Sequence, residues 1–345
     1  MAANAAAGTL FAWSVLVPGV SAEFGRPAVE LGSVFSSSMV AFAVAVLGGG
    51  STVDRNGPRR AVAMGGLLSA GGIAVGAAAG NVLVLHLGVG VLFGLGSGLT
   101  YLSVVSWATT RAGLWAAGVV VAAYAAGPIV TAPLGSLGVD RWGWRATLLV
   151  AAVTVGAVIV LASRWLPGPP EPSPALAGET EESMGDAPAL VALWWYSLAA
   201  FAPGLLAFAH AAHIATERGV SPRGAGVAVA VMAAANLAGR LCAAPLVLRI
   251  GLSWALAADL GTLALSLSVL AWLPGTAAVV VGLALLGVLY GLLGPALGAA
   301  LYDESSGYSR SFAASLGGVA IAVLALVVYR HRRGSDRDPD TASGH

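Results

Sequence analysis

The chain has 345 residues, of which 58% are hydrophobic and only 10% are charged, and its formal net charge is +1. Soluble domains carry about a quarter charged residues, so this composition indicates a polytopic membrane protein of the all-α class. The small net charge gives no reason to expect nucleic-acid binding. The only cysteine is Cys242, so an intrachain disulfide is excluded, and we expect no cleaved signal peptide, because no basic segment precedes the first apolar stretch.

Apolar runs of about 20 residues, the length that crosses a bilayer as a helix, follow one another along the chain. The first half contains six such runs, at residues 4–20, 31–50, 61–79, 82–107, 113–137 and 146–166. Residues 167–188 are rich in Pro, Glu and Ser, which predicts a flexible hydrophilic linker. The second half contains five runs, at residues 190–214, 224–248, 252–273, 276–301 and 310–329.

This pattern predicts an N-terminal six-helix bundle (1–166), a linker (167–188), an incomplete C-terminal helix bundle (189–330) and a polar tail (331–345). Arginines cluster at 54–60 and at 330–333, which places both segments, and the linker, on the cytoplasmic side. Eleven spans conflict with this orientation, because an odd number puts the two ends of a chain on opposite sides. Either one helix is missing or one apolar segment does not cross.

The two halves share a short pattern. Arg55 and Gly57 follow the second run, and Arg249 and Gly251 follow the eighth, 194 residues later. Duplicated halves with a binding site at their interface are the usual architecture of secondary transporters.

Small residues and prolines are placed where helices have to approach or bend. Gly90, Gly94 and Gly98 lie four residues apart, which predicts close contact between helices. Gly127-Pro128 and Pro133 should bend the fifth span, which suits a helix that must rock.

The segment "GGGSTVDRNGPRR" resembles the Gly-x-x-x-Asp-Arg-x-Gly-Arg-Arg signature between the second and third helices of the major facilitator superfamily. The matching residues are Gly50, Asp54, Arg55, Gly57, Arg59 and Arg60. The resemblance implies a fold of two helical bundles and a conformational latch at these residues. The alternative is that the arginines only set the membrane orientation.

Three further segments narrow the branch. Residues 8–25, 122–145 and 294–312 resemble the oxalate/formate antiporter family, which is related to the monocarboxylate transporters. The family has twelve helices, whereas here residues 283–291 look like the middle of the tenth helix and the next residues like the end of the eleventh. About eleven helices are visible, so one of the twelve is missing. The antiporter's second cationic residue is a Lys in its eleventh helix, and this chain has no Lys.

Arg240 lies near the middle of the eighth run, where a charge costs about 2.5–3.5 kcal/mol on insertion scales. Asn236 lies one turn earlier on the same helix face. In the related monocarboxylate transporters an Asp-x-x-x-Arg pair in this helix binds the carboxylate, so the resemblance implies an anion site at Asn236 and Arg240. Aromatic candidates for the same cavity are Tyr124, Trp13 and Tyr290, and the alternative for Arg240 is a structural pair or a side chain that reaches a loop.

Three ionisable residues are candidates for coupling transport to a proton or a counter-ion. Asp259 lies in the ninth run, and His210 and His213 share one face of the seventh. The alternative for Asp259 is a position at the membrane interface. We do not expect the two histidines to bind a metal ion, because too few further ligands are present.

We therefore expect a secondary active transporter, not an enzyme, with no cofactor and no bound metal. It would move a small organic anion, a mono- or dicarboxylate, across the inner (plasma) membrane by alternating access, with a proton or a counter-anion as the candidate coupled ion. We expect a multi-pass monomer in the lipid bilayer with no nucleic-acid partner. The alternatives are an exporter of drug-like solutes and a degenerate membrane protein that transports nothing.

Overall fold

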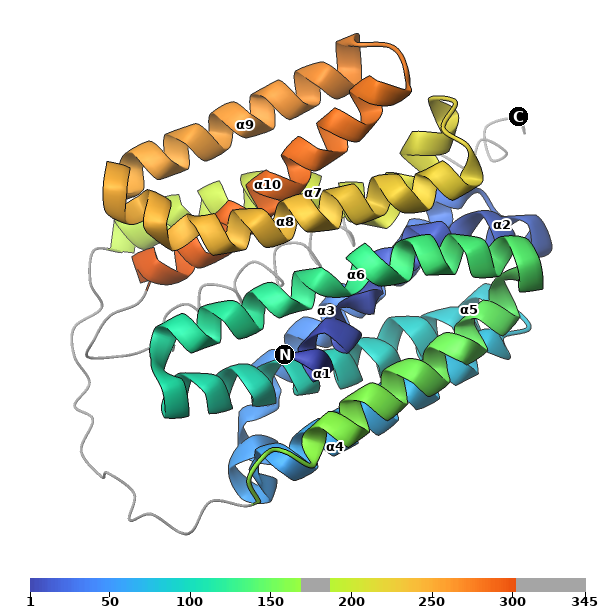
Figure 1. Ribbon diagram of the computed structural model, residues 1–345, viewed down its shortest axis with the longest axis horizontal. Helices are drawn as coiled ribbons and strands as arrows, with labels where there is room; N and C mark the ends of the chain where they lie inside the picture. Colours follow the sequence, from blue (N-terminus) through green and yellow to red (C-terminus); the bar gives the residue numbers. More distant parts are fainter. Residues whose placement is uncertain (169–186, 302–345) are drawn as a thin grey trace, which may run out of the picture. The chain divides into compact units, whose positions relative to one another are not determined.

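The computed structural model describes residues 1–168 and 187–301, and every described element is a helix (Figure 1). The predicted eleventh run, the tail and most of the linker lie outside the described residues. The chain divides into two compact units. The first comprises Met1–Glu179 and Ala200–Ala296 and contains every side chain discussed below; the second, Thr180–Ala199 with Leu297–His345, contributes only the start of α7 and the end of α10 to the described residues.

The first span is interrupted rather than straight. It consists of α1 (Ala2–Ala7), a 3-10 segment η1 (Gly8–Val15) and α2 (Val17–Phe24), with a bend of 50° between the last two. Pro18 occupies the first turn of α2, where its missing N–H is tolerated but cannot continue the hydrogen bonding of the preceding segment. The prediction at 4–20 therefore located the span and missed its bend.

The next elements cover the predicted apolar runs but do not share their bounds. They are α3 (Ala28–Gly48), α4 (Gly50–Ala77), α5 (Val82–Leu85), the π segment η2 (His86–Leu92) and α6 (Phe93–Ser163). A straight helix of the 71 residues of α6 would be about 107 Å long. Its ribbon doubles back instead (Figure 1), and at Gly143 the backbone is left-handed with φ 77°. Gly143 lies between the predicted fifth and sixth spans, so α6 contains several of the predicted crossings.

Four helices follow the linker. They are α7 (Ala187–Glu217), α8 (Pro222–Ile250), α9 (Leu252–Trp272) and α10 (Thr276–Leu301), all within three residues of the predicted runs. Ser221 caps α8, because its hydroxyl accepts a hydrogen bond of 3.1 Å from the Gly224 N–H. Among the described residues six helices are long and apolar enough to cross a membrane, or seven if the bent first pair is one span.

The Arg-x-Gly pattern marks the same backbone break in both halves. Gly57 has φ 73° and ψ 161°, and Gly251 has φ 81° and ψ 158°. This region is almost restricted to glycine, because a Cβ atom would clash there. The break at Gly57 lies inside α4 and the break at Gly251 separates α8 from α9. The predicted repeat is confirmed at this position by matching backbone angles.

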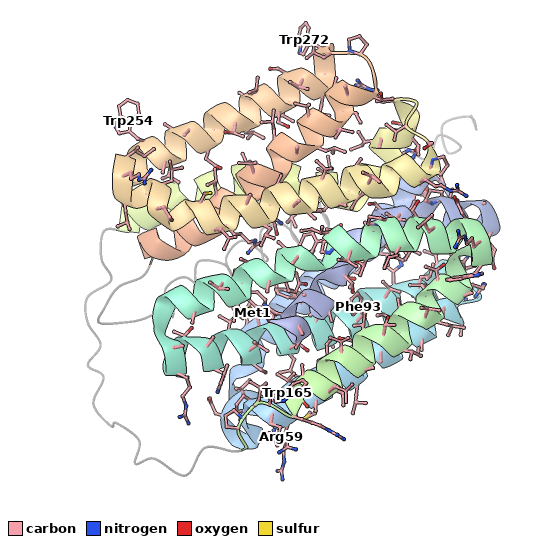
Figure 2. All side chains as sticks on the ribbon, in the orientation of Figure 1. Met1, Arg59, Phe93, Trp165, Trp254 and Trp272 are labelled. Carbon is pink, nitrogen blue, oxygen red and sulfur yellow. The ribbon has the colours of Figure 1, made fainter. Side chains whose placement is uncertain are left out.

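Exposed tryptophans mark the ends of the spans. Trp254 and Trp272 lie at opposite ends of α9 and are 72% and 82% exposed (Figure 2). Their separation of about 27 Å along the helix is close to the hydrocarbon thickness of about 30 Å. Trp165 lies near Arg59, at the end of the molecule that carries the arginine cluster (Figure 2). These positions are typical of an aromatic belt at the membrane surface.

Glycines bring the helices into backbone contact. A Cβ atom on Gly94 would lie 2.6 Å from the Ser38 carbonyl oxygen, and one on Gly98 would lie 2.5 Å from that of Phe42. The predicted close packing along this glycine row is therefore confirmed. In the second half, a Cβ atom on Gly287 of α10 would lie 2.1 Å from the Met232 carbonyl oxygen of α8.

The contact at Gly287 predicts a specific loss of stability. Gly287→Ala should lower the free energy of unfolding by about 1–3 kcal/mol, because the added methyl group overpacks against backbone that cannot move cheaply. Thermal unfolding of the detergent-purified protein measures the effect. Gly261→Ala in α9 is the matched control, since no atom lies within 4 Å of its added Cβ. Equal unfolding temperatures for the two variants would show that α8 and α10 are not packed this closely.

Candidate functional site

The guanidinium of Arg240 is held by one side chain of its own helix. Its Nε donates a hydrogen bond of 3.0 Å to Oδ1 of Asn236, one turn earlier on α8. Asn236 is buried and Arg240 is half-buried. Within the described part of the chain Arg240 makes no further hydrogen bond and no ion pair, so its Nη1 and Nη2 atoms have no hydrogen-bond partner there.

Close packing of α10 on α8 places an aromatic ring beside this charge. Cβ atoms on Gly239 and Gly291 would lie 2.5 Å and 2.2 Å from carbonyl oxygens of the facing helix, so only glycine fits at this crossing. The ring of Tyr290, next to Gly291, lies with its centroid 5.8 Å from Cζ of Arg240. This is within the range of a cation–π interaction.

An aromatic cluster continues from Tyr290 into the first half of the chain. The ring centroid of Phe11 in η1 lies 4.6 Å from that of Phe208, 5.8 Å from that of Tyr124 and 6.0 Å from that of Tyr290. The Tyr124 hydroxyl lies 2.9 Å from the Ser97 hydroxyl. All four rings are buried, and they come from both sides of the linker. Tyr124 and Tyr290, both predicted from the sequence, therefore share one cluster beside Arg240.

Phe11 and Phe208 were not predicted. The helices that carry them are apolar on every side, so hydropathy does not distinguish an interface position from a lipid-facing one. Their aromatic character, together with Tyr290 on a third helix, was the only available signal.

Polar contacts join the two halves about 25 Å from Arg240 along α8. Nε of Arg223 lies 2.9 Å from Oδ2 of Asp140, and the Ser136 hydroxyl donates a hydrogen bond of 2.7 Å to the Pro222 carbonyl. Gly226 permits this approach, because a Cβ atom there would lie 2.7 Å from Cβ of Ser136. The molecule is thus held together at the end where α7 finishes and α8 begins.

The predicted latch residues lie at the other end of these spans. Gly57 is buried and Gly50 half-buried at the start of α4. The charged latch residues are exposed, and among the described residues none of them forms an ion pair; they are Asp54, Arg55, Arg59 and Arg60. The Arg59 backbone N–H donates a hydrogen bond of 3.3 Å to the Pro167 carbonyl at the start of the linker.

The three coupling candidates lie on two helices. His210 is half-buried and packs against Gly32 of α3, where an added Cβ atom would lie 2.5 Å from its Nε2. Nε2 of His213 lies 3.2 Å from a carboxylate oxygen of Glu217. Asp259 is only 2% exposed and faces the part of α8 that follows Arg240, beside Ala243.

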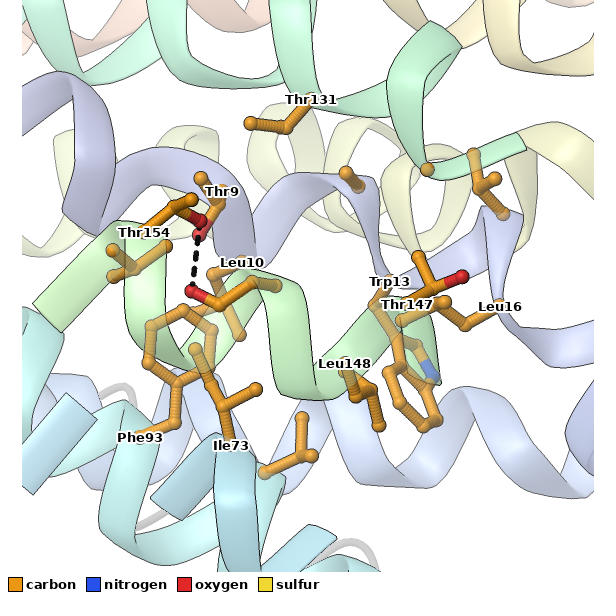
Figure 3. Close-up of a pocket in the computed structure, with 16 residues that line it drawn as sticks. Thr9, Leu10, Trp13, Leu16, Ile73, Phe93, Thr131, Thr147, Leu148 and Thr154 are labelled. Carbon is orange, nitrogen blue, oxygen red and sulfur yellow. Dashed lines mark hydrogen bonds between the residues drawn. The ribbon is translucent and has the colours of Figure 1, made fainter. Parts of the chain in front are cut away.

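Trp13 lies in different surroundings from Arg240. Its indole N–H donates a hydrogen bond of 3.0 Å to the Leu31 carbonyl. The ring lines a cavity of ≈ 100 Å³ inside the first six spans (Figure 3). Arg240 does not line this cavity. Trp13 is therefore the one predicted binding residue that the structure does not bring to the aromatic cluster.

The helical fold, the membrane-length spans and a half-buried charge beside an aromatic cluster from both halves are typical of a membrane transporter. The family comparison is specific: the model of the major facilitator superfamily matches residues 1–329. The chain belongs to this superfamily, as the latch signature indicated, and it is a transporter and not an enzyme.

Individual relatives agree with this assignment. Human monocarboxylate transporter 11 is 28% identical over 249 residues, which cover 68% of this chain and 51% of that protein. The chain thus spans about half the length of this relative. A point mutant of the nucleoside transporter NupG superposes with a TM-score of 0.70 at 15% identity, covering 91% of this chain and 85% of that one. The xylose transporter XylE from E. coli, in an inward open conformation, superposes with a TM-score of 0.66 at 15% identity. The match covers 90% of this chain and 85% of that one. The solved structures support the fold, and the predicted fold class is confirmed.

The contact between Asp140 and Arg223 predicts a measurable coupling. Both side chains are partly exposed, so the coupling energy from a double-mutant cycle of Asp140→Ala and Arg223→Ala should be about 0.2–1 kcal/mol. Denaturant unfolding at low and high salt would measure it, and salt should reduce it. The pair of Arg26 and Glu30, 3.7 Å apart on neighbouring turns, is the control for a local ion pair. Additive single effects at low salt would contradict an ion pair between the halves.

Proposed function

We propose that the protein is a secondary active transporter of a small organic anion, and that Arg240 binds the anion's carboxylate. The observation that carries the proposal is the half-buried guanidinium, oriented by Asn236 and without a counter-ion among the described residues. A guanidinium fork matches a carboxylate with two parallel hydrogen bonds. A charge kept inside a span without a partner is costly, and an anionic substrate removes part of that cost.

The neighbouring residues have distinct roles in this proposal. Asn236 positions the guanidinium through Nε, which leaves the two Nη groups to the substrate. Tyr290 and Tyr124 form the wall beside it, and Trp13 supports the bent first span from the other side. A single cationic group at the site, with no second one among the described residues, favours a monocarboxylate, and the similarity to monocarboxylate transporter 11 supports the same class.

Alternating access is supported by the difference between the two ends of the spans. At one end Asp140 and Arg223 are paired across the halves. At the other end the latch charges around Gly57 are exposed and unpaired among the described residues. We propose that this arrangement is one of two states, and that the latch residues Gly50, Asp54, Arg55, Gly57, Arg59 and Arg60 pair when the Asp140 end opens.

Coupling to a proton would use Asp259, His210 or His213. His210 is the strongest of the three, because it packs against α3 from the other half of the chain and would sense movement between the halves. His213 has Glu217 as a partner at the end of the same helix. Asp259 would act through α8, next to the turn that follows Arg240.

Substitution of Arg240 tests the proposal directly. In vesicle uptake of labelled lactate, formate and oxalate, Arg240→Ala should lose at least about tenfold in kcat/KM, equivalent to about 1.4 kcal/mol of lost binding. The kcat/KM of Arg240→Lys should lie between those of the wild type and Arg240→Ala, since lysine keeps the charge but lacks the planar guanidinium. Arg249→Ala is the control, because Arg249 is exposed at the end of the same helix.

Each outcome of this experiment selects one function. Equal uptake by wild type and Arg240→Ala would overturn the anion site. Uptake of uncharged solutes that does not depend on Arg240 would support the exporter alternative. If a folded wild-type protein takes up none of the tested solutes, the result would support the alternative of a degenerate protein that no longer transports.

Asn236→Asp should make anion uptake pH-dependent. At high pH the new carboxylate would pair with Arg240 and compete with the substrate, whereas at low pH it would be protonated and release the guanidinium. Uptake by the variant, relative to wild type at the same pH, should therefore rise as the pH falls. Asn236→Ala serves as the control without a titratable group. A constant ratio across the pH range would show that position 236 does not contact the binding charge.

A further inference from the structure

The cavity behind Trp13 has a chemistry that the proposed transport function does not use (Figure 3). It has a volume of ≈ 100 Å³ and lies among η1, α4, η2 and α6. Its deepest wall consists of Leu10, Ile73, Val89 and Phe93, each at most 3% exposed. No charged side chain lines it.

Three of the four threonine hydroxyl groups of the wall are already occupied, and the fourth belongs to Thr9. Thr131, Thr147 and Thr154 each donate to the carbonyl four residues earlier on their own helix, at 2.8–3.0 Å. A buried water needs about two to four polar partners, and apolar cavities of this kind stay dry and accept apolar ligands. The cavity therefore suits an apolar occupant and not water or an anion.

The cavity lies where two irregular helical segments meet. Leu10 and Trp13 belong to the 3-10 segment η1, and Val89 belongs to the π segment η2. The side chains of such segments do not follow the spacing of a regular α-helix, so they leave space beside α6. An occupant would contact the first span next to its bend at Leu16, which also lines the cavity.

The rim of the cavity reaches the lipid-facing surface. Thr154 is exposed, and so is its neighbour Val153 at 72%; Thr131 lies next to Val130, which is 59% exposed. Thr154 is about 14–17 Å along the helix from Ser163 and from Gly143. The rim is thus near the middle of a hydrocarbon layer of about 30 Å, where the methyl ends of lipid chains lie and headgroups do not.

We propose that this cavity binds the methyl end of an acyl chain of a membrane lipid. The gain comes from van der Waals contacts that an empty cavity forfeits, because transfer from lipid to protein offers no hydrophobic gain. The bound chain would support the bent first span from behind and stabilise the position of Phe11 in the aromatic cluster. The occupant is therefore a structural ligand and not the transported substrate.

Photo-crosslinking tests the proposal in vesicles of phosphatidylcholine and phosphatidylglycerol. One vesicle preparation contains a phospholipid with a diazirine at the methyl end of its chain, and the other has the diazirine next to the ester. The methyl-end probe should label the buried residues Leu10, Phe93 and Leu148 several-fold more than the ester-end probe. Mass spectrometry of the digested protein gives the labelled positions. Interior labelling no greater with the methyl-end probe would overturn the proposal, whatever any variant does.

Gly135→Leu provides the second arm. Gly135 lines the cavity, and an added Cβ atom would make only an ordinary contact of 3.7 Å with Val15, so a leucine should fit and fill space. Interior labelling should fall several-fold, while labelling of exposed Leu260 and Leu265 should not change. Gly261→Leu, on the exposed face of α9, is the matched control. Unchanged interior labelling in a folded Gly135→Leu protein would overturn the proposal, and added lactate should not compete with the label.

Discussion

The hydrogen bond between Arg240 and Asn236 is the interaction on which the candidate site depends. A guanidinium in the middle of an apolar span has to be oriented, or it turns toward the nearest water. Asn236 is neutral, so it orients Nε without neutralising the charge. An aspartate at the same position would supply the counter-ion itself. In the proposed function, the neutral partner is what leaves the positive charge available to a substrate.

The glycines of α8 and α10 make this arrangement possible. Their backbones approach so closely at Gly239 and Gly291 that Tyr290 is placed against the guanidinium. The same ring contacts Phe11 and Phe208, so the charge, the α8–α10 crossing and the contact between the two halves form one connected cluster. A change in the bend of the first span would move Phe11 and would be felt at Arg240. In the proposed transport cycle, this connection would couple substrate binding to movement between the halves.

The sequence predicted the parts of this fold that depend on hydropathy and on glycine. The ends of α8 and α9 agree with the apolar runs, because a helix in lipid has to be as long as its apolar segment. Gly57 and Gly251 were predictable as a repeat, because only glycine adopts the backbone angles of both breaks. The pair of Arg240 and Asn236 was predictable from helical spacing alone.

A hydropathy pattern could not predict other features of the structure, and the reasons are physical. The 3-10 and π segments differ from an α-helix in hydrogen bonding and not in composition, so the cavity beside Leu16 left no trace in the apolar runs. Asp140 and Arg223 are 83 residues apart, and their pairing follows from the crossing of α6 and α8. The count of eleven spans stays a prediction, since the last run lies outside the described residues.

The first span contacts both the aromatic cluster and the apolar cavity. Phe11 has to pack against α7 and α10, whereas Trp13, two residues later, faces α4 and α6 around the apolar cavity. In a straight α-helix the directions of residues two apart differ by about 160°, and the 3-10 segment reduces this difference to about 120°. The irregular segment thus sets the angle between the aromatic side chain that faces the aromatic cluster and the one that faces the cavity. A bent span of this kind needs support on the side away from the proposed substrate, and a filled cavity at Trp13 would provide it.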